Sequence, residues 1–227
     1  MTKPLVIAGD GEFAEIACEY FTHDSDYRVD GFAVEAAFRK RDEVSGRPVV
    51  DLETIEQSWP PSTHAVFVAA TYTELNRVRT RLLRTCRGKG YAAATYVSSH
   101  AFVWHDVKVG ENCFIFENNV VQYRATIGDN VVLWSGNHVG HRAVVGDNCF
   151  LSSHVVVAGY CTLGENCFLG VNSSLGDHVS IGRDCVVGAG AVVLKDCDDR
   201  RILRGNPAAI AEGADPLRLF RVKEPHD

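Results

Sequence analysis

The feature that most constrains this chain is an uninterrupted period of six residues in its second half. From Val97 to Val193, every sixth residue is valine, isoleucine or leucine. Four residues after each of these positions stands a small or modest side chain, mostly alanine, cysteine, valine or serine, with Asn119 and Asn137 as polar exceptions. A fixed short period without insertions indicates a solenoid, in which each repeat buries its apolar residues against the next.

Three hexapeptides make up a longer repeat of 18 residues. The hexapeptide VGENCF, which starts at Val109, returns with small changes as IGDNVV, VGDNCF, LGENCF and IGRDCV at intervals of 18. This predicts a triangular parallel β-helix with a short strand on each side, inward-pointing apolar and small residues, and a bend at each corner. The bends need residues that tolerate positive φ, and one corner column holds Asn112, Asn130, Asn148, Asn166 and Asp184.

The repeat also explains most of the cysteines. Cys149, Cys167 and Cys185 occupy the same small inward position on successive coils, and Cys113 stands in that column two coils before Cys149. Because stacked strands are about 4.8 Å apart, sulfur atoms in line cannot converge at the roughly 2.3 Å that tetrahedral zinc requires. We therefore expect this column to pack the interior as reduced thiols and not to bind a metal.

Residues 1–92 follow a different pattern, in which apolar strands alternate with helices. Strands are predicted at residues 5–8, 28–34 and 64–70, and helices at residues 12–21 and 73–87. This alternation predicts a small Rossmann-like α/β domain. The chain is therefore expected to divide into an α/β domain (residues 1–92), the β-helix (93–198) and a C-terminal cap segment (199–227).

A glycine turn follows the first predicted strand. Gly9-Asp10-Gly11 matches the first part of the dinucleotide-binding fingerprint GxGxxG. The third glycine of that fingerprint is replaced by Ala14. Such a turn can present backbone N–H groups to a phosphate at a helix N-terminus. A nucleotide site and a merely tight turn both fit this fragment.

Charge and hydropathy exclude two classes of partner. The formal net charge of −6 and a pI near 5.8 give no basic surface for nucleic acid. No segment approaches eighteen uninterrupted apolar residues, so no membrane span is expected. The first residues also lack the charged region, apolar core and cleavage site of a signal peptide, which predicts a cytoplasmic protein.

At this point the sequence resembles a known family. The hexapeptides, the N-terminal α/β pattern, the stretch GNHVGHRAVVGDNCFLSSHVVVAG (residues 136–159) and the closing GNPA at residues 205–208 are similar to hexapeptide-repeat nucleotide-sugar acetyltransferases. These include bacillosamine-pathway and perosamine N-acetyltransferases and sialic acid O-acetyltransferase-type proteins. The resemblance implies a left-handed parallel β-helix, a homotrimer, acetyl-CoA between neighbouring β-helices, and acetylation of a nucleotide-linked deoxyamino sugar. No metal is expected, from the cysteine column and from the histidine spacing.

The resemblance also implies roles for individual residues. His141, the third residue of VGHRAV, matches the catalytic base, and Gly159, its equivalent one coil later, matches the backbone donor to the thioester oxygen. An imidazole is suited to take the proton of the attacking amine, and a fixed N–H stabilises the developing oxygen charge. The implied cofactor contacts are Phe150, Gly159, Val171 and Ala189. Ser153 is added because it shares one corner column with Val171 and Ala189. The implied substrate contacts are Gly9, Asp10, Gly11, Glu12 and Glu35. His138 ends the preceding hexapeptide, a position that fits either a substrate contact or a turn and packing role.

One position departs from the family pattern. Many relatives carry a glutamate or aspartate directly after the histidine, and this chain carries Arg142. A cation beside an imidazole favours its neutral form. Either another acceptor, such as Glu117 or Asn137 from a nearby coil or subunit, orients the ring, or His141 is a weaker base than in relatives.

Several alternatives stay open from the sequence. Transfer to a sugar hydroxyl is the nearest one, and the nucleotide could be GDP, UDP or dTDP. A zinc enzyme of the carbonic anhydrase type would need three histidines, and the spacing gives no clear set. A non-catalytic scaffold would use only the N-terminal domain. Basic side chains before the GNPA segment fit either the phosphates of CoA or a solvated turn: Arg200, Arg201 and Arg204.

Overall fold

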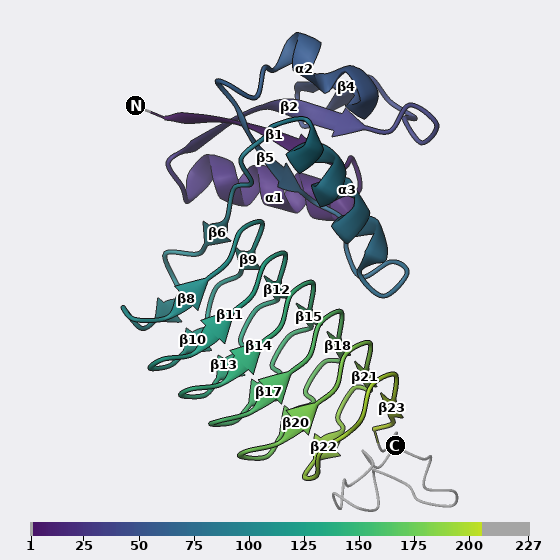
Figure 1. Ribbon diagram of the computed structural model, residues 1–227. Coiled ribbons are helices and arrows are strands. Elements are labelled where there is room, and N and C mark those ends of the chain that lie inside the picture. The colour runs from purple at the N-terminus through teal and green to yellow at the C-terminus, as the bar shows by residue number, and fades with distance from the viewer. Residues whose placement is uncertain (1, 206–227) are drawn as a thin grey trace, which may run out of the picture.

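The computed structural model describes residues 2–205, and its N-terminal part is an α/β layer structure (Figure 1). One sheet has the order β3-β4-β2-β1-β5 and is parallel except for the β3–β4 hairpin. Helix α1 packs on one face through Phe13 and Phe21, and the other face is covered by α2 and α3. The strands are β1 (Lys3–Ala8), β2 (Tyr27–Val34), β3 (Glu43–Val44), β4 (Arg47–Asp51) and β5 (Ala65–Val68). The helices are α1 (Glu12–His23), the 3₁₀ turn η1 (Leu52–Thr54), α2 (Ile55–Ser58) and α3 (Arg77–Gly88).

The predicted α/β alternation is confirmed, with one helix start in the wrong place. The sequence pattern predicted that the last helix starts at residue 73, whereas α3 begins at Arg77. Three consecutive residues before it, Glu74, Leu75 and Asn76, have φ between 51° and 66°. This left-handed stretch is incompatible with a right-handed helix, and the hairpin β3–β4 and the short α2 were also not anticipated.

The second half is a parallel β-helix of three sheets, as the hexapeptides predicted. Paired strands are 18 residues apart, for example Val120 with His138 and Phe150 with Phe168, except in the last pair, where Val186 pairs with Ile202. The covered face, which carries the α/β domain, consists of β6 (Tyr96–Val97), β9 (Phe114–Ile115), β12 (Val132–Leu133), β15 (Phe150–Leu151), β18 (Phe168–Leu169), β21 (Val186–Val187) and β23 (Ile202–Leu203). The arrangement is consistent with a left-handed β-helix.

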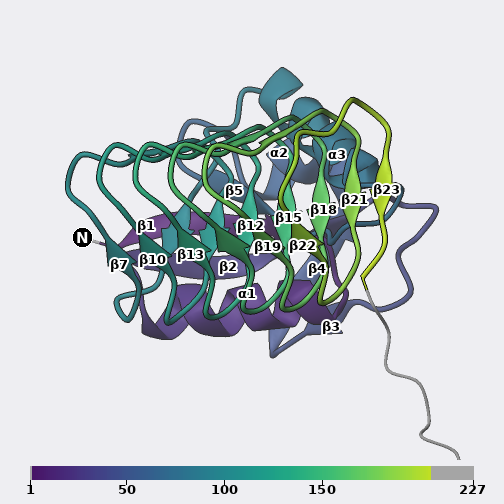
Figure 2. The same ribbon diagram turned by 90° about the horizontal axis from the view of Figure 1, so that it is seen from below.

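Within residues 2–205, the other two faces bear no domain. The second face consists of β7 (Phe102–Val103), β10 (Val120–Val121), β13 (His138–Val139), β16 (Val156–Val157), β19 (Ser174–Leu175) and β22 (Val192–Val193). Figure 2 views several of these strands side by side from below. The third face consists of β8 (Lys108–Val109), β11 (Thr126–Ile127), β14 (Val144–Val145), β17 (Thr162–Leu163) and β20 (Ser180–Ile181).

The interior and the corners follow the predicted repeat. The apolar and small positions form one buried core, which includes the cysteine column. At the corners from Asn112 to Gly190, the fourth residue of each hexapeptide has positive φ, from 53° at Asn112 to 79° at Gly136. In the predicted asparagine column, Asn112 Nδ2 donates to Asn130 Oδ1 and Asn130 Nδ2 to Asn148 Oδ1, both at 2.8 Å. Amide ladders of this kind tie successive coils together.

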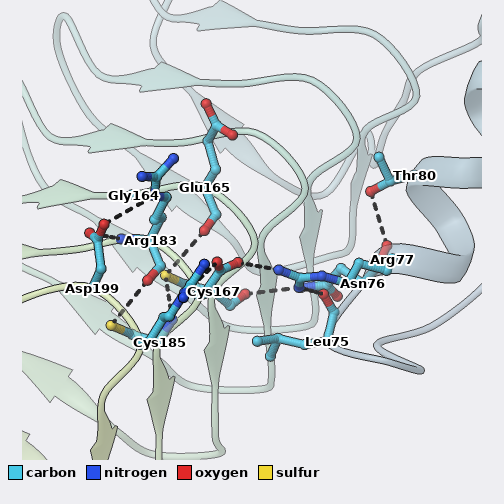
Figure 3. A network of polar contacts seen from close by, with 12 residues as sticks. Leu75, Asn76, Arg77, Thr80, Gly164, Glu165, Cys167, Arg183, Cys185 and Asp199 are labelled. Carbon is cyan, nitrogen blue, oxygen red and sulfur yellow. Dashed lines mark hydrogen bonds and ion pairs between the residues drawn. The ribbon is translucent and has the colours of Figure 1, made fainter.

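Helix α3 docks on the corner that carries this asparagine column (Figure 3). Asn76 Nδ2 donates to the carbonyl oxygen of Cys167 at 3.2 Å, and Arg77 pairs with Asp184 at 2.5 Å. The buried Arg79 donates to the carbonyl oxygen of Asn130. These contacts and the aromatic packing of α1 on the covered face fix the α/β domain against the β-helix.

The described residues bear on the expected absence of a membrane span and on the expected C-terminal segment. None of the helices among residues 2–205 has the length and apolar character needed to cross a bilayer. The expected cap segment is described only through Gly205, so the remainder of the GNPA motif lies outside the described residues.

Candidate functional site

The two glycines of the N-terminal turn have different structural roles. Gly9 follows β1 with φ 128°, and a Cβ there would lie 2.8 Å from the carbonyl oxygen of Ala69. Gly11 is the N-cap of α1 in extended conformation, and no atom lies within 4 Å of its Cβ position. Gly9 is therefore required by the backbone, whereas Gly11 faces open space.

These roles give a paired prediction about stability. Gly9→Ala should lower the free energy of unfolding by about 1–3 kcal/mol, because alanine is strained at this φ. Gly11→Ala should change it by less than about 0.5 kcal/mol. Urea unfolding of both variants measures the difference, and equal stabilities would contradict the assigned roles.

A cavity of about 340 Å³ opens where β1 and β2 end. Ligands of parallel sheets bind at this edge. Its walls are mostly apolar, and Glu35 accepts two hydrogen bonds from Arg81, at 2.5 and 2.9 Å. The Arg81 guanidinium holds the pKa of Glu35 below its usual value. The lining residues include Ala8, Gly9, Val34, Glu35, Phe38, Leu52, Val78, Arg81 and Leu82.

A single arginine compensates the acidic residues of the glycine turn. Arg41 donates to the carbonyl oxygen of Asp10 and, at 2.8 Å, to Glu15. Glu12 and Glu15 lie in the first turn of α1, where the helix dipole favours negative charge. A phosphate bound at this turn would depend on Arg41 and on the free N–H groups of the first helical turn.

A groove leads from the glycine turn to the β-helix. One hollow of about 420 Å³ is lined by Gly11, Glu12, Phe13, Ile16, Ala69, Thr71, Tyr72 and Trp134. A second of about 300 Å³ is lined by Thr71, Tyr72, Trp134, Phe150, Ser152, Ser153 and Val171. Because the two share Thr71, Tyr72 and Trp134, we treat them as one feature, the Tyr72–Trp134 groove. It brings together members of the predicted substrate and cofactor sets.

The far end of this groove is the Ser153 corner, which joins the covered face to the second face. Ser153, Val171 and Ala189 occupy the same position on successive coils, as the spacing predicted. Within residues 2–205, their backbone N–H groups donate to no partner. Val171 is 43% exposed. The corner therefore presents a row of free donors, one per coil.

His141 lies at a different corner, between the second and third faces. Its ring rests on Gly159: a Cβ on that glycine would lie 2.5 Å from Cε1 and 3.0 Å from both ring nitrogens. The backbone N–H of His141 donates to Gln122 Oε1 at 3.1 Å. Neither ring nitrogen has a hydrogen-bond partner in the described part of the chain, so the imidazole is exposed and available.

The backbone N–H of Gly159 is already engaged. It donates to Asp177 Oδ1 at 2.9 Å. At another corner, the backbone N–H of Asp129 donates to Asp147 Oδ1 at 2.8 Å. Capping of a corner N–H by an aspartate of the next coil is therefore a recurrent feature of the repeat. A thioester oxygen could reach the Gly159 N–H only if the Asp177 carboxylate moved away.

The structure also bears on what orients His141. Glu117 lies at the Ser153 corner and accepts from the Tyr20 hydroxyl at 3.1 Å. Asn137 is buried, donates to the carbonyl oxygen of Trp134 at 2.6 Å and accepts from Val155 N–H at 2.7 Å. Among the described residues of one copy, neither side chain hydrogen-bonds His141. An acceptor from another subunit, or a weaker base, stays a prediction.

The remaining predicted residues lie apart from these features. His138 is half-buried on the second face in β13. Arg200 and Arg201 lie within 4 Å of Asp184 and Asp198, respectively. No group of three or more histidine, cysteine, aspartate or glutamate side chains between residues 2 and 205 is arranged to hold a metal ion.

Within one chain, the predicted base therefore stands outside the groove. His141 and Gly159 share one corner, the groove ends at another, and the second face lies between them. The sequence located each column correctly but gave no indication of Arg41, Arg81, Tyr72 or Trp134. These side chains reach the site through contacts distant in the sequence.

Comparisons with known proteins agree on the architecture. A family model described as bacterial transferase hexapeptide (six repeats) matches residues 124–159 and 160–195. The chain is similar to the crystal structure of PerB from Caulobacter crescentus in complex with CoA and GDP-perosamine, at 28% identity, with 92% of this chain and 97% of that chain covered and a TM-score of 0.79. Other structures of that perosamine N-acetyltransferase carry asparagine or alanine in place of a histidine.

Two more distant structures share the fold. The acetyltransferase domain of PglB from Neisseria gonorrhoeae is 22% identical, with 92% of this chain and 99% of that chain covered and a TM-score of 0.81. WeeI from Acinetobacter baumannii is 21% identical over the same shares of the two chains, with a TM-score of 0.76. A comparison with curated protein sequences gives no match.

Proposed function

Because the chain is a member of the hexapeptide-repeat acetyltransferases, we propose that it transfers the acetyl group of acetyl-CoA to the amino group of a nucleotide-linked deoxyamino sugar. Residues 1–92 would bind the nucleotide and residues 93–198 would carry out the transfer. The observation that carries this proposal is the Tyr72–Trp134 groove. A substrate with its nucleotide at the glycine turn would extend its sugar along this groove toward an acyl donor at the Ser153 corner.

The nucleotide end of this path offers complementary chemistry. The apolar cavity beside Glu35 and Arg81 can hold a base or ribose, with polar groups at its rim. Gly11 leaves room for phosphate oxygens close to the backbone, and Arg41 supplies a cation at the same turn. A 28% identical relative, PerB, was crystallised with CoA and GDP-perosamine, which supports a substrate of this class.

The acyl-donor end fits the pantetheine arm of CoA. This arm is a chain with amide carbonyl groups, and the Ser153 corner presents free N–H donors on successive coils, about 4.8 Å apart. Phe150 and Val171 supply apolar contacts beside them. Backbone donors recognise carbonyl groups without demanding particular side chains, which accounts for the modest residue types along the corner.

His141 would reach this groove from a neighbouring copy. We infer a homotrimer of left-handed β-helices with its axis parallel to theirs, which sets equal coils at equal heights. Trp134 and Ser152, which line the groove, are one coil apart, and His141 lies between them in the sequence. His141 of one copy would therefore stand at the height of the neighbour's groove. Apolar side chains exposed on and beside the second face suit such contacts: Phe102, Trp104, Val156, Val192 and Leu194.

The proposed reaction needs no covalent enzyme intermediate. The sugar amine attacks the thioester carbonyl carbon, His141 removes the proton from the amine nitrogen, and the C–S bond breaks to release CoA. The Gly159 N–H would stabilise the oxygen charge of the tetrahedral intermediate once the Asp177 carboxylate has moved aside. His138, on the face between the two corners, would contact the sugar.

The test is a transfer assay with purified protein, acetyl-CoA and a panel of GDP-, UDP- and dTDP-linked amino sugars. We expect CoA thiol release that depends on one of the sugars, with an acetylated product that survives mild alkali, as an amide does. Loss of the acetyl group in alkali would assign transfer to a hydroxyl instead. Failure to bind acetyl-CoA in calorimetry would contradict the proposal and favour a scaffold role.

A further inference from the structure

The His141 ring has no polar partner in this chain to fix its orientation. Arg142 follows it where an acid would be able to accept from the imidazole, and no hydrogen bond to either ring nitrogen is formed among residues 2–205. An imidazole on an exposed corner would otherwise sample several rotamers. A base that must meet a bound amine gains from a preset geometry, so the packing around the ring is the remaining means of orienting it.

Two successive residues of the next coil contact the ring. Gly159 lies against the Nδ1–Cε1–Nε2 edge of the ring. The ring can lie this close because glycine has no Cβ. Tyr160 meets it edge to face, with ring centroids 5.1 Å apart and an angle of 83° between the planes. The backbone N–H of Tyr160 also donates to the carbonyl oxygen of His141 at 3.0 Å. Both contacts are local to the His141 corner.

Tyr160 is itself held between the adjacent coils. His178, from the following coil, stacks on its ring with centroids 4.7 Å apart and planes 5° from parallel. Arg142, from the preceding coil, has its guanidinium carbon 5.7 Å from the Tyr160 centroid and 5.9 Å from that of Tyr123. Cation–π attraction draws the charge of Arg142 toward these two rings. The tyrosine therefore has restricted freedom and can serve as a fixed wall.

We propose that Tyr160 is a positioning residue that sets the orientation of the His141 imidazole by aromatic packing, in place of a carboxylate. Arg142 and His178 are the groups that fix Tyr160. The ionisable groups around this cluster are Tyr123, Arg142, Asp177 and His178. The inference rests on the proposed function, in which His141 acts as the base. Because the contact is made by the ring and not by the hydroxyl, phenylalanine should replace tyrosine with little loss.

The experiment measures kcat and KM for Tyr160→Phe and Tyr160→Ala, each in the wild-type and the His141→Ala background. We expect Tyr160→Ala to lower kcat about three- to tenfold, the size of one aromatic pair, with KM for acetyl-CoA unchanged. Tyr160→Phe should stay within about twofold of wild type, since it keeps the ring. In the His141→Ala background, Tyr160→Ala should have no further effect, because the two residues act as a unit.

Each alternative outcome is distinct. If His141→Ala itself keeps wild-type kcat, the proposed base is wrong and the inference fails with it. Suppose instead that His141→Ala is impaired. If Tyr160→Ala then keeps wild-type kcat, or if Tyr160→Ala lowers kcat equally in both backgrounds, only the positioning role is overturned. A smaller assembly mass for Tyr160→Ala would assign the residue to subunit contacts instead. His178→Ala, which removes only the stacking partner, should lower kcat in the same direction and supplies a second test should Tyr160→Ala fail to fold.

Discussion

Replacing His141 with alanine is expected to lower kcat by about 10²- to 10⁴-fold, the usual contribution of a general base. The imidazole is exposed, neither of its nitrogens has a hydrogen-bond partner among residues 2–205, and its ring rests on Gly159. Binding of acetyl-CoA should be unchanged, because the free N–H donors lie at the Ser153 corner. Steady-state kinetics with the accepted sugar, together with calorimetry of acetyl-CoA binding, measures both quantities.

A matched control exists at the other corner. His154 rests on Gly136 much as His141 rests on Gly159, since a Cβ on Gly136 would lie 2.6 Å from its Cε1 and Nδ1. His154→Ala should therefore reproduce the structural effect of losing a corner histidine; because His154 lies beside Ser153 at the proposed acyl-donor corner, its loss should alter at most the KM for acetyl-CoA and leave kcat unchanged. Similar kcat values for the two alanine variants would refute the role of His141.

Gly159→Ala is expected to lower kcat by about 10²-fold without unfolding the protein. The new Cβ would lie 2.5 Å from His141 Cε1, so the ring must move by about 1 Å, a displacement of the size that can reduce turnover about 100-fold. Gly159 does not have positive φ, so alanine introduces no backbone strain. Kinetics and thermal unfolding of this variant are the measurements.

The double variant identifies the cause. If Gly159→Ala acts by displacing the ring, it should add nothing in the His141→Ala background. An additional loss there would show that Gly159 has a role of its own, as the donor to the thioester oxygen would have. Wild-type kcat in Gly159→Ala would contradict the contact with His141; the donor role would be unaffected, because alanine keeps the backbone N–H.

The sequence predicted the β-helix in detail because its repeat leaves little freedom. Inward apolar residues at a strict interval of six fix the strands, and the 18-residue coil fixes their register. The positive-φ corner at Asn112 followed from the same count. Handedness came only from the resemblance to a family, because the period does not encode it.

The site was less predictable because its parts come together through distant contacts. Arg81 reaches Glu35 across 46 positions of the sequence, and Arg41 reaches Asp10 across 31. Tyr72 lines the groove from a loop whose left-handed residues broke the expected helix. The capping of Gly159 by Asp177 depends on side-chain geometry that spacing alone does not give.

The central claim is that one active site combines the groove of one copy with His141 of another, and subunit complementation tests it most directly. Val171→Arg should block the Ser153 corner, and His141→Ala should remove the base, so each variant alone should be nearly inactive. Co-assembled trimers should regain activity, because about a quarter of the sites would pair an intact groove with an intact histidine. Mixed trimers as inactive as their parents would contradict a shared site and with it this account of the enzyme.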